Sequence, residues 1–128
     1  MKNIISVVGN NTIHKKIVDT LVKHYPSVNI ISISDQLDTT YALNNRLNII
    51  KSDLLETNNF LNAIMKSTGI IHTVDEEVMG IESALKIKKI ILPNAKFVFM
   101  TKKDNINIDK SIIVKYGKVI NTNDKPWE

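Results

Sequence analysis

The sequence predicts an α/β protein in which a parallel sheet is covered by helices on both faces. Strand-like runs alternate with helical patterns along most of the chain, as in strands joined by crossover helices. The runs at 3–8 and 28–34 are β-branched and almost continuously apolar, which is typical of strands buried on both faces. A glycine or an acid follows each of the first three strands, at Gly9, Asp35 and Asp53.

Hydrophobic periodicity places the individual elements. The first helix keeps its apolar spacing up to Tyr25 and stops at Pro26. Apolar residues from Leu54 to Met65 outline the helix after the third strand, with Thr57 or Asn58 as its cap. We expect strands at 3–8, 28–34, 47–51, 69–74 and 96–100. We expect helices at 13–25, 54–65 and 76–92, and a short helix or an irregular crossover at 36–45.

The five strands and the tail predict one domain. Right-handed crossovers favour the sheet order 3-2-1-4-5. The stretch 111–122 alternates and contains Tyr116-Gly117-Lys118, which predicts a C-terminal hairpin or an extra edge strand. We therefore expect a single domain over 1–128, with a core at 1–103 and a tail at 104–128.

Composition disfavours several classes of protein. Without cysteine and with three histidines, the chain predicts neither disulfides nor a zinc framework. The net charge of +4 comes from dispersed lysines without interleaved aromatics, which makes nucleic-acid binding an unfavoured interpretation. No segment has the ~18 apolar residues of a membrane span, and the N-terminus lacks a signal peptide, so we expect a cytoplasmic protein. Frequent isoleucine, asparagine and lysine suit an AT-rich genome, bacterial, protist or viral.

The candidate site lies where the sheet order reverses. Ligands of such sheets bind beyond the carboxyl ends of the strands, at the switch between strands one and four. The loops that converge there start at Gly9, Asp35, Asp53, Val74 and Thr101.

Three segments carry a resemblance to a known family: Ser52-Asp53-Leu54, Ile70-Ile71-His72-Thr73 and the strand from Phe97 to Thr101. Over 3–103 the chain resembles the extended short-chain dehydrogenase/reductase family, most closely its 3β-hydroxysteroid dehydrogenase and epimerase-like members. The resemblance implies a three-layer Rossmann-like sandwich that binds NAD(P), with the Asp53 carboxylate accepting a hydrogen bond from the adenine amino group. The cofactor-binding residues it implies are Gly9, Asn10, Asn11, Asp35, Asp53, Leu54 and Thr101.

Asp35 at the end of the second strand has two interpretations. A carboxylate there binds the adenine ribose hydroxyls of NAD and repels the extra phosphate of NADP. An aspartate that ends a strand also commonly caps a turn.

The phosphate loop departs from the family. The segment from Gly9 to His14 keeps only the first of three glycines, although Asn11 can adopt the left-handed conformation that the turn needs. At the place of the last glycine, His14 would attract a phosphate or serve as a partly exposed structural histidine, and we favour the structural role. For His72, on a central strand, we expect a core histidine.

Catalytic residues of the family have no counterpart. Its tyrosine needs a lysine four residues later to lower the phenol pKa, and Tyr25, Tyr41 and Tyr116 all lack one. The acidic residues at 75–77 would hold a divalent cation or complement a helix dipole, and we favour the dipole and predict no metal. No segment matches the part in which the family binds its substrate.

Three functions remain open from the sequence. The first is a degenerate, non-catalytic domain that acts through a protein contact or a homodimer, using the helix at 76–92, strand 96–100 and the tail. The second is a small NAD or nucleotide binder that senses or carries its ligand. The third is an active reductase to which a second chain supplies the missing acid.

Overall fold

The computed structural model describes residues 3–10, 12–36, 45–74, 77–101 and 118–121. All six strands of the described part lie in one sheet. The strands are β1 (Asn3–Gly9), β2 (Val28–Ser34), β3 (Leu47–Lys51), β4 (Gly69–Thr73), β5 (Lys96–Thr101) and β6 (Lys118–Asn121). The helices are α1 (Thr12–His24), the short 3-10 helix η1 (Thr57–Phe60), α2 (Leu61–Lys66) and α3 (Glu77–Lys88).

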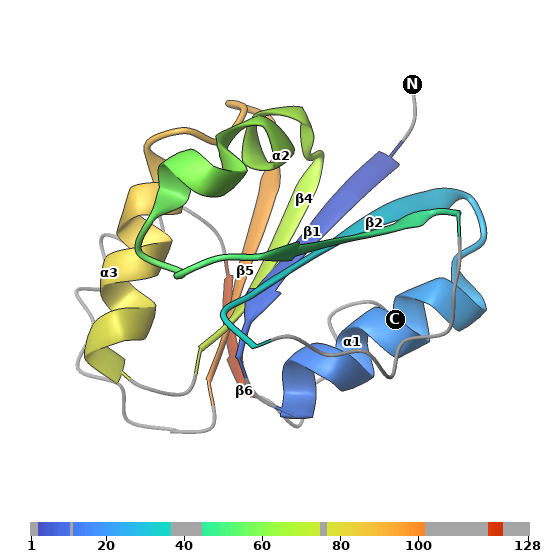
Figure 1. Cartoon of the computed structure of the whole chain (residues 1–128), viewed down its shortest axis with the longest axis horizontal. Coiled ribbons are helices and arrows are strands. Elements are labelled where there is room, and N and C mark those ends of the chain that lie inside the picture. Colours follow the sequence, from blue (N-terminus) through green and yellow to red (C-terminus); the bar gives the residue numbers. More distant parts are fainter. Residues whose placement is uncertain (1–2, 11, 37–44, 75–76, 102–117, 122–128) are drawn as a thin grey trace.

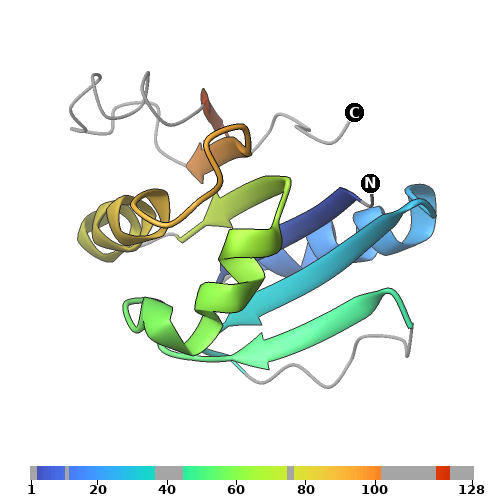
Figure 2. The ribbon, with the colours of Figure 1, turned by 90° about the horizontal axis from the view of Figure 1, so that it is seen from above.

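The sheet is parallel, in the order β3-β2-β1-β4-β5-β6 (Figure 2). The predicted order of the first five strands is therefore confirmed. The extra edge strand predicted for the tail is confirmed, because β6 pairs with β5 at the end of the sheet. The first half of the alternative hairpin over 111–122 lies outside the described residues. Tyr116 and Gly117 lie outside the described residues.

Two apolar layers hold helices on opposite faces of the sheet (Figure 1). Alternate residues of each buried strand point to opposite faces, so Val7 packs with α1 while its neighbour Val8 packs with η1, α2 and α3. The α1 layer contains Val7, Ile17, Val18, Leu21, Val28, Ile30 and Ile71. The opposite layer contains Val8, Ile31, Ile33, Leu54, Phe60, Ala63, Ile64, Ile70, Val74, Ile87 and Phe97. This arrangement is the predicted three-layer sandwich.

The single arginine of the chain ties the end of α1 to the start of β2. The Arg46 guanidinium donates from Nη1 to the carbonyls of Tyr25 (2.9 Å) and Val28 (2.8 Å), and from Nη2 to that of Val22 (2.7 Å). Carbonyls at a helix end lack partners within the helix, and a cation there also complements the helix dipole. Arg46 thus fixes the end of the molecule opposite the carboxyl ends of the strands.

Two helix predictions were wrong in their limits. The expected helix at 54–65 is a loop, then η1 and α2, because Leu54 is a core residue of the loop and not of a helix. Neither Thr57 nor Asn58 is the cap, since η1 begins at Thr57 after Glu56 and shows no side-chain cap. The helix expected at 76–92 ends at Lys88. The crossover expected at 36–45 lies almost wholly outside the described residues.

Candidate functional site

The predicted site residues that the structure describes lie at the carboxyl ends of the parallel strands. Gly9 is paired with Thr73 across β1 and β4, and Ser34 with Lys51 across β2 and β3. Asp35 therefore leaves the sheet beside the segment that leads to Asp53, since β2 pairs with β1 on one side and with β3 on the other. This edge contains the switch point, because α1 follows β1 on one face whereas α3 follows β4 on the other.

Gly9 is required by the packing of β1 against β4. A Cβ at Gly9 would lie 2.6 Å from Thr73 Oγ1, 2.8 Å from the Thr73 carbonyl oxygen and 3.1 Å from the Cβ of His14. The first two distances are too short for any side chain, and one of them involves backbone. The remaining glycine of the loop thus has a structural reason to be there before any ligand is considered. Asn10 is half-buried in a bend after it, and Asn11 lies outside the described residues.

His14 is a structural residue between α1 and the sheet. Its side chain is buried, with Nε2 3.1 Å from the Val7 carbonyl and 3.3 Å from Ser32 Oγ. Because a carbonyl only accepts, Nε2 carries the hydrogen and donates it to Val7. Of the two alternatives for this histidine, the structural one is confirmed, but the side chain is only 4% exposed and is therefore buried, where a partly exposed one was expected.

Asp35 carries a buried oxygen that the fold leaves unsatisfied. The residue is partly exposed, yet its Oδ1 is buried and has no hydrogen-bond partner among the described residues. The turn after β2 is capped by its neighbour, since Ser34 Oγ accepts the Gln36 amide hydrogen at 3.1 Å. This geometry weighs against Asp35 as a turn cap. An unsatisfied buried acceptor is unfavourable and demands an explanation, and ribose hydroxyls are suitable donors for it.

Asp53 and Leu54 form a tight turn after β3. Asp53 is exposed, and its Oδ1 accepts the Leu55 amide hydrogen at 2.9 Å. Leu54 is fully buried, so neither its side chain nor its backbone is exposed to solvent. Thr101 ends β5 at the same edge, where it is paired with Asn121 of β6.

A buried polar chain links this turn to β4 and α3. His72 Nε2 lies 3.0 Å from Ser83 Oγ, which in turn donates to the Leu54 carbonyl at 3.1 Å. The serine uses its one hydrogen on Leu54, so His72 donates to the serine through Nε2–H. Burial lowers the pKa of His72 from 6.5 to about 3, and its ring stacks on Phe97 with centroids 6.1 Å apart. The predicted core histidine is confirmed, and its imidazole stays neutral at physiological pH.

Sequence reasoning missed Ser83 entirely. Gly80, Ser83 and Ile87 are buried at helical spacing on one side of α3, and this spacing is the only local signal that could have placed the serine against the sheet.

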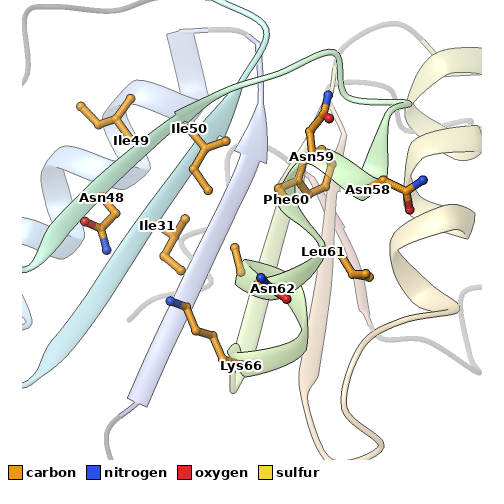
Figure 3. A pocket seen from close by; sticks show the side chains of 11 residues that line it. Ile31, Asn48, Ile49, Ile50, Asn58, Asn59, Phe60, Leu61, Asn62 and Lys66 are labelled. Carbon is orange, nitrogen blue, oxygen red and sulfur yellow. The ribbon is translucent and has the colours of Figure 1, made fainter.

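A groove of about 520 Å³ on the α2 face is separate from these residues. Figure 3 shows Ile31 and Ile50 of the strands facing Asn62 and Lys66 of α2 across it. Its lining has asparagines and one charged side chain, Lys66. The lining residues contain no carboxylate or histidine that could form an acid–base pair with Lys66.

The described residues form neither a metal cluster nor a membrane-spanning helix. They contain no group of three or more histidine, aspartate or glutamate side chains that could hold a metal ion. The acids Asp75 and Glu76 lie outside them. None of the described helices has the length and apolarity that a membrane crossing requires.

Comparison with known proteins shows the fold. The sequence matches no protein-family model and no curated protein. Vestitone reductase from alfalfa is similar in structure, with a TM-score of 0.62 and 19% identity over 77% of this chain and 36% of the reductase. An NAD-bound short-chain dehydrogenase/reductase superfamily protein from Agrobacterium tumefaciens has a TM-score of 0.58 and 11% identity over 74% of this chain and 32% of its own.

A third similar structure has nearly the same extent as this chain. The TrkA-N domain of the inner membrane protein ybaL from Escherichia coli has a TM-score of 0.73 and 12% identity, over 94% of this chain and 88% of the domain. This chain spans only about a third of the length of the two reductases. The chain is thus a Rossmann-like α/β domain of the kind on which short-chain dehydrogenases/reductases are built.

Replacing Gly9 tests the close approach of β1 and β4. We expect Gly9→Ala to lower the free energy of unfolding by about 1–3 kcal/mol, because the new methyl group meets Thr73 backbone that cannot move aside. Gly69→Ala is the control, since its Cβ would meet Ile5 and Lys96 only at 3.8 and 3.9 Å. Urea unfolding measures both. Equal effects of the two substitutions would contradict the packing constraint.

The buried His72 predicts a pH dependence of stability. Its pKa is lower in the folded chain, so the unfolded chain binds the extra proton, and stability is complete above pH 6.5 and falls as the pH drops toward 3. From pH 7.5 to 5 we expect a loss of about 2 kcal/mol that His72→Phe does not show. Urea unfolding at both pH values measures the difference. If stability changed equally with pH in the wild-type chain and in His72→Phe, the pKa of His72 would be the same in the folded and unfolded chain, which would contradict this prediction.

Proposed function

We propose that this chain is a non-catalytic Rossmann domain that binds NAD through its adenosine half and senses or carries it. The observation that supports this most is the buried, unsatisfied Oδ1 of Asp35 at the carboxyl end of β2. A free-standing fold gains nothing from an unpaired buried acceptor, whereas a dinucleotide-binding fold uses an acid at this place for the ribose. The residues that would hold the adenosine are Asp35 and Asp53.

Charge favours NAD over NADP at this edge. Asp35 and Asp53 follow neighbouring strands, and a second phosphate on the ribose would be brought next to both carboxylates. Among the similar structures, one short-chain dehydrogenase/reductase contains NAD and another, from Veillonella parvula, contains NADP. The fold therefore accepts both cofactors, and the acids of this chain argue for NAD.

The loop after β1, which would face the phosphates of NAD, adds little to the binding affinity. The loop keeps Gly9 and Asn10, while His14 is committed to Val7 and Ser32 within the layers. Thr101, at the end of β5, is the remaining candidate at this edge. We expect most of the affinity to come from adenosine.

The tyrosines argue against independent catalysis. Tyr25 follows α1 at the end opposite the site, where its carbonyl accepts the Arg46 guanidinium. Tyr41 and Tyr116 lie outside the described residues, and neither has the lysine that lowers a phenol pKa. The ybaL domain has nearly the same extent as this chain, with 88% of it covered, whereas this chain covers only about a third of vestitone reductase and of the Agrobacterium protein.

Calorimetry on an Asp35 variant tests the proposal. We expect Asp35→Ala to weaken NAD binding by roughly tenfold to a hundredfold, because a charged acceptor is lost. The stability of the ligand-free chain should stay unchanged or rise by up to about 1 kcal/mol, since an unsatisfied acceptor disappears.

The control is Asp19→Ala, a partly exposed acid on α1, which should leave NAD binding as it is. Absence of binding by the wild-type chain at millimolar NAD would remove the proposal.

Self-association is a second candidate function. A cavity of about 330 Å³ lies beside β4 and β5 on the α1 face, with Ile5, Ile71 and Val98 in its lining. After α3, the Leu92 side chain is 41% exposed. Exposed apolar surface of this kind suits a contact with a second copy through the segment 76–92, strand 96–100 and the tail.

Light scattering during size exclusion tests the second candidate. We expect a homodimer at micromolar concentration that Leu92→Glu converts to monomer, with Lys89→Glu as the control for added charge. A wild-type chain that elutes only as monomer would rule this contact out.

A further inference from the structure

We infer that Ser83 of α3 is a positioning residue for the adenosine site, because it holds the Leu54 carbonyl and thereby the turn that presents Asp53. The inference rests on the proposed function for its ligand, and on the buried hydrogen-bond chain from His72 through Ser83 to Leu54 for its geometry.

The chain joins three separate parts of the fold. His72 belongs to β4, Ser83 to α3, and Leu54 to the loop after β3, 29 residues before the serine. The three residues have no measurable exposure, so water cannot replace a missing partner. The hydroxyl satisfies the Leu54 carbonyl as a donor and His72 as an acceptor at the same time.

Leu54 is the centre of the turn that would meet adenosine. The Asp53 carboxylate closes over it to the Leu55 amide at 2.9 Å, so a fixed Leu54 fixes the direction of that carboxylate. The Ser52 amide ties the start of this stretch to β2 through the Ser34 carbonyl at 2.9 Å. The other side-chain hydrogen bonds near the turn are local: Asn59 Nδ2 donates to Ser52 Oγ, which donates to the Asp53 carbonyl. Ser83 adds a connection from this turn to α3.

The consequence for binding is pre-organisation. A carboxylate that is already oriented loses little freedom when the ligand arrives, whereas a mobile turn must be ordered at the expense of affinity. Ser83 touches no ligand in this account and acts only through Leu54.

The chain offers a matched control in Ser67. This serine is also fully buried, and its hydroxyl donates to the Ala63 carbonyl at 2.6 Å while it interacts with Ser6 Oγ at 2.7 Å. It precedes β4 at the amino end of the sheet, away from the site. Ser67→Ala therefore removes the same kind of group from a similar environment without touching the turn.

The experiment compares Ser83→Ala with Ser67→Ala by two measurements: hydrogen exchange of the Leu55 amide by NMR, and calorimetric titration with NAD. We expect Ser83→Ala to reduce the protection of Leu55 and to weaken NAD binding roughly tenfold. Ser67→Ala should lower the overall stability of the chain. It should leave NAD affinity unchanged, and Leu55 should exchange no faster than the loss of global stability explains. His72→Phe keeps the bond between Ser83 and Leu54 and should retain Leu55 protection.

The outcomes separate this inference from the proposed function. Should the wild-type chain bind no NAD, the proposed function fails, and Leu55 protection alone decides whether Ser83 holds the turn. Unchanged Leu55 exchange and NAD affinity in Ser83→Ala, or equal losses in Ser67→Ala, would overturn the inference. If Ser83→Ala does not fold, Ser83→Cys provides a weaker donor at the same place and should show a partial effect in the same direction.

Discussion

The close approach of Gly9 to Thr73 is the constraint on which the carboxyl edge of the sheet depends. There is no room for a Cβ between the end of β1 and the end of β4, and the Cβ of His14 on α1 lies against the same point. Three elements therefore meet at one residue, at the place where the strand order reverses. The positions of the loops after β1 and β4, and with them the shape of the site, follow from that contact. A glycine that resembles a phosphate-loop residue has a packing role first.

The hydrogen bonds of the buried polar side chains indicate which residues support the fold and which are available to a ligand. His14 and His72 both donate through Nε2–H to partners on neighbouring elements, and their acceptors are carbonyl or hydroxyl oxygens. These bonds make the two histidines part of the scaffold. Asp35 lies at the carboxyl end of β2, and its buried Oδ1 has no hydrogen-bond partner among the residues that the structure describes. A buried carboxylate oxygen without a partner at the place where such sheets bind ligands supports the proposed binding role.

Local sequence signals were sufficient to predict the strands and their order, but they did not predict the contacts between elements. The limits of β2 and β3 were predicted to the residue, because continuous β-branched runs are bounded by polar turn residues. The α2 region was predicted poorly, since the apolar spacing of Leu54 with Phe60 does not distinguish a buried loop residue from a helical one. Arg46 and Ser83 were not predicted, because their partners are 11 to 29 residues away in the sequence. The helical spacing of Ser83 with Gly80 and Ile87 does not by itself identify those partners. The position of Asp35 followed from the strand pattern, whereas its unsatisfied oxygen is visible only in three dimensions.

We propose that this Rossmann-like scaffold, with Asp35 and Asp53 after neighbouring strands and one glycine where β1 ends, holds an adenosine group without transforming what is attached to it. The amide spectrum of the isotope-labelled chain, recorded during titration with NAD, tests this claim most directly. The account predicts saturable shifts concentrated at Gly9, Asn10, Asp35, Asp53 and Leu55. Shifts that instead gather around Asn48, Asn62 and Lys66 in the groove on the α2 face, or no shifts at millimolar NAD, would contradict it.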